Sequence, residues 1–391
     1  MRWKSTCLIG LTFSLLGFFS RESLQACSFC SGNVQRLTTL RQEAGQAKLV
    51  LIGTMTNPRL IGEGEKAIGV TDFMIETILR DHTVLIDHKK LTVSRYIPVD
   101  EKRPARFLLF CDVNQGKIDP YRGVPVHSEG LSKYLVTASA LPVHDPVGLL
   151  KFYATHLNSD DPEISQDSFL EFAKTSDTHV EQIAKHLNPE VVRACLTNPK
   201  TPIERIGVFA YLLGLCGTAQ DGESLRLRLE STDKTNHETF GGLLTGFVML
   251  KPEAGWKWIQ QRLDRADSSV ADKLAIVGTL RYFQVKGGKP ARDKIMILYR
   301  SLLSDRNLCD LVIEDLRRWG WYDLTPPILA LYDQPMYTAP IVRNGILRYA
   351  LCCPNPEAAS FITDQRKKFP DVIRDLEESI AFERQAAPKI P

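Results

Sequence analysis

The spacing of apolar residues changes near residue 145, and this change divides the chain into two parts. Between residues 48 and 140, short apolar runs and apolar–polar alternation are separated by clusters of Gly, Pro, Asn and Asp. Segments of this kind predict β-strands joined by turns. The predicted strands are residues 49–53, 71–79, 90–97 and 106–110, and the predicted turns are Asn57-Pro58 and residues 62–64, 114–116 and 119–123.

Several short strands at close spacing predict a small closed barrel or a sandwich. The pattern at residues 131–141 predicts a helix that closes this part.

From residue 146 onward, the apolar positions follow a helical period, and one unit returns at intervals of 33 to 39 residues. Helix pairs at a fixed period are typical of an α-solenoid, and an irregular helical bundle is the alternative. Equivalent positions of the unit hold small or β-branched residues, namely Ser168, Gly207, Gly242, Ala275, Val312 and Gly345.

The partner helix of each unit has a recurring start in which proline stands at the first helical position and glutamate follows it. The three examples are Asn188-Pro189-Glu190, Lys251-Pro252-Glu253 and Asn355-Pro356-Glu357. Proline is pre-organised for this position, and glutamate interacts well with the positive end of the helix dipole. We expect Gly207 and Gly345 to mark close helix–helix approach, and Gly222 to lie in a loop.

The helical part resembles HEAT-type repeats over residues 146–369, as in Asp160-Asp161-Pro162-Glu163-Ile164 before a helix. The front part resembles the netrin-like domain, the OB-type barrel of tissue inhibitors of metalloproteases, through Cys27, Cys30 and residues 47–53, 73–80 and 107–110. The predicted fold is therefore α+β and multidomain, with a small N-terminal β-barrel followed by an all-α HEAT-like solenoid. The predicted domains are residues 27–142 and 146–384, and residues 385–391 are predicted to be a disordered tail.

The first 26 residues have the pattern of a secretory signal peptide. Arg2 and Lys4 are followed by an apolar run at residues 7–19, and Ala26 ends the leader with a small residue. The run is too short for a bilayer span of about 20 residues, so we expect cleavage before Cys27 and an extracytoplasmic protein. Leu24-Gln25-Ala26-Cys27 also resembles a lipobox, which makes a lipid anchor at Cys27 the alternative.

Charge gives no sign of a nucleic-acid partner. The leader holds three of the 49 basic and one of the 46 acidic residues, so 46 basic and 45 acidic residues remain and the net charge is +1. Nucleic-acid binding needs a concentration of positive charge. We expect no nucleic-acid partner and no membrane span.

Eight cysteines remain after the leader, and an exported protein can form disulfides. Cys27 and Cys30 form the only Cys-x-x-Cys pair, and they lack the second pair that a zinc site needs and the preceding strand of a redox motif. We expect a structural bridge that involves Cys27, Cys30 or Cys111. The sequence shows no catalytic, cofactor or metal-binding motif, so no cofactor and no metal are predicted.

Aromatic residues gather in the helical part and are the candidate partner-binding residues. Solenoids bind extended partners along one face, where aromatic side chains serve as anchors. The candidates are Trp256, Trp258, Trp319, Trp321 and Tyr322. The sequence thus favours a non-catalytic binding or scaffold protein with a protein or peptide partner. The alternatives are a protease-inhibitor-like or metal-dependent front domain, and a thiol redox role for Cys27 and Cys30.

Overall fold

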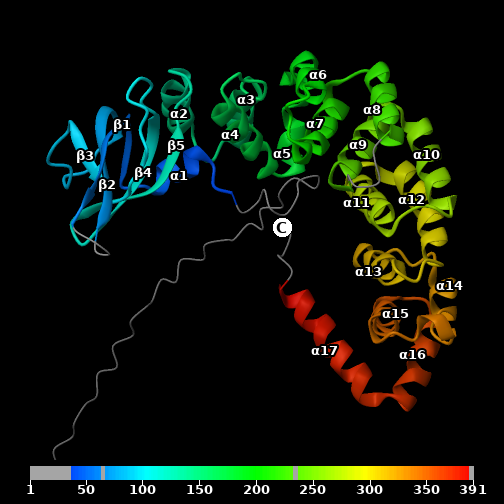
Figure 1. Ribbon diagram of the computed structural model, residues 1–391. Coiled ribbons are helices and arrows are strands. Elements are labelled where there is room, and N and C mark those ends of the chain that lie inside the picture. Colours follow the sequence, from blue (N-terminus) through cyan, green and yellow to red (C-terminus); the bar gives the residue numbers. More distant parts are fainter. Residues whose placement is uncertain (1–36, 63–66, 232–236, 387–391) are drawn as a thin grey trace, which may run out of the picture.

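The computed structural model describes residues 37–62, 67–231 and 237–386. Its architecture is α+β, with one five-stranded antiparallel sheet near the N-terminal end and helices after it. In Figure 1 the helices form an arc that begins beside the sheet, and the C-terminal end of the last helix turns towards the inside of the arc. The predicted leader and the cysteine pair Cys27 and Cys30 lie outside the described residues.

The sheet is open and has the strand order β3-β2-β1-β4-β5, with every neighbouring pair antiparallel. Strands β3 and β5 form its two edges. The four predicted strands are present as β1 to β4, of which β1, β2 and β4 are longer than predicted. Strand β3 covers only the first half of the predicted residues 90–97, and β5 was not predicted. The strands are β1 (Leu49–Ile61), β2 (Ile68–Arg80), β3 (Lys90–Val93), β4 (Arg106–Asn114) and β5 (Lys117–Pro125).

Two predicted turns are wrong, because their prolines lie inside strands. Asn57-Pro58 is part of β1, at a register shift where Asn57 has a φ of 49°. Pro120 lies in β5, which is an edge strand and also has a register shift beside it. Proline lacks the N–H that a central strand would need, and strands tolerate it at edges and bulges.

The predicted turn at residues 114–116 is confirmed as the β4–β5 hairpin. Asn114 pairs with Lys117, so Gln115 and Gly116 are the two central residues of the turn. Both have a positive φ, at 50° and 76°. This combination defines the type I′ turn, whose twist matches that of the flanking strands.

The two faces of the sheet belong to different apolar clusters. Strand alternation places Val50, Ile52, Leu108 and Phe110 on one face, where they pack with α1 (Leu40–Gln46) and α2 (Gly130–Ala140). Helix α2 corresponds to the predicted helix at residues 131–141. The other face forms a separate cluster with the loops next to β3, and its buried members are Leu49, Leu51, Met55, Phe73, Leu85, Val93, Leu109 and Cys111.

Helices occupy the rest of the described chain, as the predicted change of period requires. Helix α17 continues into the first part of the predicted tail, and residues 387–391 lie outside the described residues. Short 3₁₀ turns occur at η3 (Ala184–His186) and η4 (Pro335–Tyr337). The helices are α3 (Pro146–Ala154), α4 (Pro162–Ala173), α5 (Asp177–Gln182), α6 (Pro189–Thr197), α7 (Ile203–Cys216), α8 (Ala219–Ser231), α9 (His237–Leu250), α10 (Pro252–Asp264), α11 (Val270–Lys286), α12 (Gly288–Leu302), α13 (Cys309–Trp319), α14 (Thr325–Ala330), α15 (Pro340–Cys352), α16 (Pro356–Lys368) and α17 (Pro370–Ala386).

The helices from α7 onward stack in two layers along the arc. In one layer, α7 packs on α9, α9 on α11, α13 on α15 and α15 on α17. The second layer contains α8, α10, α12, α14 and α16, and each of these contacts a helix of the first layer. Arg281 of α11 and Asp315 of α13 form an ion pair at 2.8 Å. This pair links α11 to α13, the next helix of the first layer.

The predicted repeat positions agree with this layering. Gly207, Gly242, Ala275, Val312 and Gly345 lie on α7, α9, α11, α13 and α15, the successive helices of the first layer. Proline is at the start of α6, α10 and α16, as predicted.

The glycine predictions have mixed outcomes. Gly207 marks close approach, because a Cβ built on Gly242 would lie 2.0 Å from the Gly207 carbonyl oxygen. The prediction for Gly345 is wrong, since its nearest neighbour would be Ile313 Cγ2 at 4.0 Å. Gly222 lies within α8 and not in a loop, and a Cβ there would be 2.8 Å from Lys251 Cγ. The repeat position alone therefore does not set the distance between helices.

The sheet and the helices share one continuous apolar cluster across the predicted boundary at residues 142–146. Tyr134 of α2 stacks on Phe152 of α3 with ring centroids 5.4 Å apart. The buried Asp167 of α4 accepts hydrogen bonds from the Leu40 backbone N–H at 2.6 Å and from the Tyr134 hydroxyl at 2.8 Å. Burial raises the pKa of Asp167 to about 7, against the opposing effect of these two donors.

Candidate functional site

The five predicted aromatic residues are all half-buried, and they lie in two places. Each packs against the continuous apolar cluster with part of its ring. Trp256 and Trp258 both belong to α10, whereas Trp319, Trp321 and Tyr322 lie at and after the end of α13.

The two tryptophans of α10 lie on different faces of the helix. Trp256 packs on Phe283 with ring centroids 5.4 Å apart, and the Lys294 ammonium lies 5.8 Å from the Trp256 ring centre. Trp258 packs on Phe240 and borders a shallow pocket of 370 Å³ beside Arg262. Each ring is occupied by a structural contact on at least one side.

Gly320 determines how the second aromatic group is arranged. It ends α13 with a φ of 67°, in the left-handed region that glycine adopts readily. The Trp321 N–H then donates to the Leu316 carbonyl at 2.9 Å. The resulting tight turn brings Trp319 and Trp321 together, with ring centroids 4.9 Å apart.

Trp321 is covered by a cation from the second layer. The Arg292 guanidinium of α12 lies 5.1 Å from the Trp321 ring centre, and it pairs with Asp323 at 2.6 Å. Cation–π contacts of this type stabilise the fold by about 0.5–1 kcal/mol at exposed sites. Trp321 therefore has a structural role in this arrangement.

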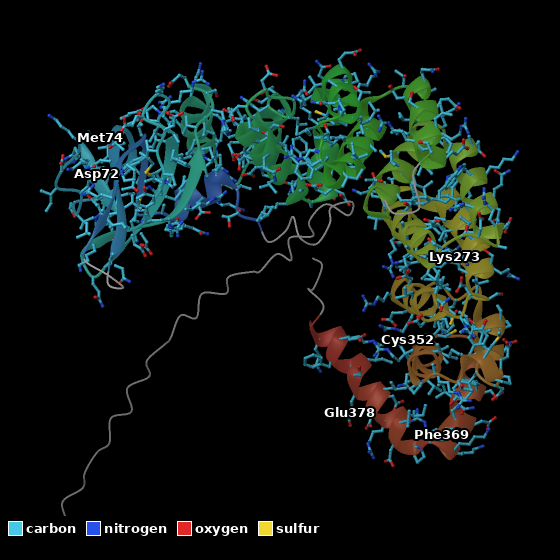
Figure 2. The ribbon with its side chains drawn as sticks, in the orientation of Figure 1. Asp72, Met74, Lys273, Cys352, Phe369 and Glu378 are labelled. Carbon is cyan, nitrogen blue, oxygen red and sulfur yellow. The ribbon has the colours of Figure 1, made fainter. Side chains whose placement is uncertain are left out.

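Trp319 and Tyr322 line a groove of 630 Å³ between α13, the end of α15 and α17, which we call the C-terminal groove. Cys352, labelled in Figure 2, stands in its wall at the end of α15. Tyr299 stacks on Trp319 from beneath, with centroids 5.3 Å apart, and Tyr349 supports Tyr322 in a T-shaped contact. The lining residues are Arg317, Arg318, Trp319, Gly320, Tyr322, Cys352, Ile380, Glu383 and Arg384.

An ion network holds α17 against the groove. The Arg317 side chain is only 8% exposed, and it forms two hydrogen bonds to Glu314, at 2.7 and 2.8 Å, and one to Glu383 of α17 at 2.9 Å. Arg348 of α15 also pairs with Glu383. Paired, hydrogen-bonded charges of this type are the strong ones, so the position of α17 depends on Arg317 and Arg348.

The network also shifts the pKa of Glu314. Burial alone would raise this pKa, but hydrogen bonds from Arg317 and Arg318 outweigh burial and lower it to about 2. Burial would also raise the pKa of Glu383, but the hydrogen bonds and charges of Arg348 and Arg317 together outweigh it and lower this pKa. Both carboxylates are therefore charged at neutral pH, and both are paired with arginines of the protein itself.

Two arginines at the groove remain available to a partner. The Arg318 side chain is 66% exposed although it contacts Glu314. Arg384 is exposed and has no carboxylate in ion-pair contact among the described residues. The groove therefore combines two aromatic faces with two accessible positive charges, an arrangement that can bind an acidic segment carrying apolar side chains.

Sequence reasoning found Trp319 and Tyr322 but missed the basic side of the groove. Arg317 and Arg318 adjoin Trp319 in the sequence, so the run Arg-Arg-Trp-Gly-Trp-Tyr was a usable signal. Arg384 lies 62 residues beyond Tyr322 in the sequence, and no local pattern brings the two together.

The predicted disulfide residues are only partly within the described chain. Cys27 and Cys30 lie outside it, so the predicted bridge stays a prediction. Cys111 is a free, fully buried thiol of β4, and burial raises its pKa to about 12. A thiol of this pKa is a poor nucleophile at neutral pH.

The described residues contain no cluster of three or more His, Cys, Asp or Glu side chains that could hold a metal ion. None of the described helices has the length and apolar character to cross a bilayer. No protein family, curated protein or solved structure matches this chain.

Proposed function

We propose that this chain is a non-catalytic binding or scaffold protein that recognises a protein or peptide partner through the C-terminal groove. The leader pattern of residues 1–26 supports a location outside the cytoplasm, in the periplasm or in the secreted fraction. A lipid on Cys27 would add a membrane anchor.

The proposal includes a finer description of the two parts. We propose that the helices form a HEAT-like solenoid, and the two-layer stack with its repeated proline starts supports this description. We also propose that the front part is a netrin-like barrel. Its support is the strong curl of the sheet, because residues next to β3 and residues of β5 line one common cavity.

The observation that carries the functional proposal is the composition of the C-terminal groove. Trp319 and Tyr322 offer apolar area, and Arg318 and Arg384 provide positive charge beside it. Aromatic and arginine side chains are the residue types that contribute most to binding energy at protein interfaces. The partner is therefore expected to present carboxylates next to aromatic or aliphatic side chains.

A random peptide library displayed on phage tests this proposal. The library is selected on the full chain and counter-selected on a variant with Trp319→Ala and Arg384→Glu. Peptides that survive should be acidic and contain large apolar residues, and the double variant should bind them at least about tenfold more weakly, equivalent to about 1.4 kcal/mol.

A matched control separates groove recognition from general attraction. Arg374→Glu makes the same charge change on α17, and Arg374 does not line the groove. It should leave the binding of the selected peptides unchanged. If Arg374→Glu weakens binding as much as the groove variant does, or if no selected peptide depends on the groove, the proposed site is wrong.

A further inference from the structure

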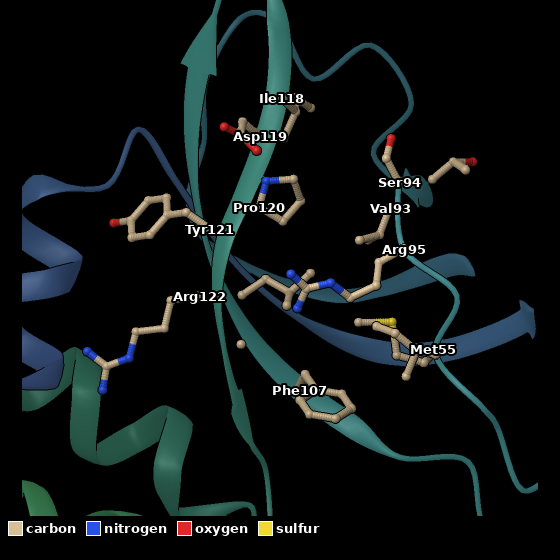
Figure 3. Close-up of a pocket in the computed structure, with 14 residues that line it drawn as sticks. Met55, Val93, Ser94, Arg95, Phe107, Ile118, Asp119, Pro120, Tyr121 and Arg122 are labelled. Carbon is tan, nitrogen blue, oxygen red and sulfur yellow. The ribbon is translucent and has the colours of Figure 1, made fainter. Parts of the chain in front are cut away.

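A second cavity lies in the curled sheet, on the face opposite α1 and α2. Its volume is 330 Å³, and we call it the sheet pocket (Figure 3). Pockets for small molecules have volumes of about 300–1,000 Å³, so the sheet pocket fits a compact ligand. Its apolar wall is formed by Met55, Val93, Ile97, Phe107, Leu109 and Ile118.

The backbone of β5 keeps one wall of the pocket open. Gly123 pairs with Leu109 and therefore lies on the same face of the sheet, where it presents no side chain. A Cβ on Gly123 would lie 3.2 Å from Leu109 Cδ2, which is a tight contact. A larger residue at this position would extend into the space that glycine leaves free.

Arg95 extends across the sheet pocket, between Pro120 on one side and Met55 and Phe107 on the other (Figure 3). The buried Thr71 holds the backbone at this point. Its hydroxyl donates to the Arg95 carbonyl at 2.9 Å and accepts from the Ile97 N–H at 2.9 Å. These bonds hold the backbone at Arg95, whose side chain is exposed.

The guanidinium of Arg95 has no carboxylate partner among the described residues. The buried carboxylate on the neighbouring strand, Asp72, already pairs with Arg59 at 3.0 Å and accepts hydrogen bonds from Asn57 and Thr92. Two other charged residues line the pocket. Asp119 stands on β5, and Arg122 points away from the cavity in Figure 3 and pairs with Glu43 at 2.6 Å. An unpaired cation over an apolar wall is complementary to an anionic head attached to an apolar body.

We propose that the sheet pocket binds a small anionic amphiphile, with its carboxylate on Arg95 and its hydrocarbon part against Leu109 and Phe107. This binding is independent of the C-terminal groove. The sheet would then be a ligand-binding part of the protein in its own right.

Calorimetric titration of the full chain with octanoate tests this proposal, with the neutral 1-octanol as a second probe. Octanoate should bind the unchanged chain more tightly than octanol. Arg95→Met keeps the apolar wall but removes the charge, and it should weaken octanoate binding about tenfold, as expected for a lost charge-assisted contact. The same substitution should leave octanol binding unchanged.

Two further variants make the result specific. Gly123→Val should abolish binding of both probes, and far-UV circular dichroism confirms that the variant is folded. Arg103→Met removes an exposed arginine of the same β3–β4 connection that does not line the pocket, and it should have no effect. The proposal is overturned if octanoate does not bind at low-millimolar concentration, if octanol binds equally well, or if Arg103→Met has the same effect as Arg95→Met.

Discussion

The α7–α9 pair and the α13–α15 pair lie in the same layer of helices, and each pair carries residues from the same repeated position. In α7–α9 that position is glycine on both helices, and the backbones meet directly. A Cβ on Gly242 would lie 2.0 Å from the Gly207 carbonyl oxygen, and a Cβ on Gly246 would lie 2.3 Å from the Ala210 carbonyl oxygen. In α13–α15 the glycine of α15 faces the β-branched Ile313 of α13, and a Cβ on Gly345 would lie 4.0 Å from Ile313 Cγ2.

In these two pairs, the backbones meet directly only where both helices carry a small residue at the contact. Val312 and Ile313 are fully buried and keep α15 at a distance. The wider spacing at this end of the arc leaves room for aromatic rings and ion pairs between the helices. The tight pair has a structural role, whereas the wider end can form a binding groove.

The largest effect is expected from Gly242→Leu. The added side chain must displace the α7 backbone, because even its Cβ has no space. Overpacking of this kind costs about 1–3 kcal/mol, and we expect the upper end of that range. Urea unfolding followed by circular dichroism measures the loss.

The control is Gly278→Leu on α11, where a Cβ would have no neighbour within 4 Å. This variant should be neutral or slightly stabilising, because glycine is about 1 kcal/mol less favourable than alanine in a helix and leucine is close to alanine. Equal destabilisation by both variants would contradict the close approach of α7 and α9.

A smaller effect is expected from Arg317→Met at the wider end. Methionine keeps much of the apolar stem of the arginine. However, Glu314 loses its two hydrogen bonds from Arg317, and Glu383 keeps only Arg348 as a partner. Hydrogen bonds to charged groups contribute about 1.5–3 kcal/mol each. Because Glu314 keeps Arg318 and Glu383 keeps Arg348, the net loss should be about that of one such bond. Hydrogen exchange should show the loss mainly in α17. Exchange that increases equally in α7 and α9 would mean that Arg317 does not act locally.

The same network predicts how stability depends on pH. The pKa of Glu314 falls from its usual 4.5 to about 2 in the folded chain. A lowered pKa contributes stability that is present above the unfolded pKa and is lost as pH falls towards the folded pKa. The urea concentration at the unfolding midpoint should therefore decrease as the pH is lowered from about 5 to about 2. In Arg317→Met this decrease should be smaller. An unchanged slope in the variant would show that Arg317 does not lower the pKa of Glu314.

The smallest effect is expected from Gly345→Ala. A methyl group has ordinary space next to Ile313, so the helix propensity of alanine should stabilise the chain by up to about 1 kcal/mol. Thermal melting measures the gain. A lower melting temperature would mean that α13 and α15 approach as closely as α7 and α9.

The change from strands to helices could be predicted from the sequence, but α1, β5 and the lengths and contacts of the elements could not. Apolar period alone separates the strands from the helices, and Pro189, Pro252 and Pro356 locate three helix starts. Pro58 and Pro120 were wrongly taken as signs of turns. Proline is excluded from a central, regular strand but is tolerated at sheet edges and bulges, where these two residues lie. Whether a strand lies at an edge depends on pairing that the local sequence does not encode.

The candidate site was only half predictable for a similar reason. Trp319 and Tyr322 stand out by residue type, and Gly320 between them indicates a helix end. That Trp321 turns away to Arg292, while Arg384 joins the groove from α17, depends on packing between distant helices. Contacts between helices that are far apart in the sequence depend on how all the helices between them pack, and no single segment of the sequence predicts them.

Photo-cross-linking tests the central claim most directly. The probe is a synthetic peptide that alternates aspartate with phenylalanine and carries one benzophenone side chain, with a lysine-for-aspartate peptide as the control. Mass spectrometry of the irradiated full chain should find the acidic peptide attached to fragments of α13 and α17 that contain Trp319 or Ile380, and the lysine peptide should label neither. Attachment to α7, α9 or the sheet, or equal labelling by both peptides, would contradict the assignment of the C-terminal groove as the partner site.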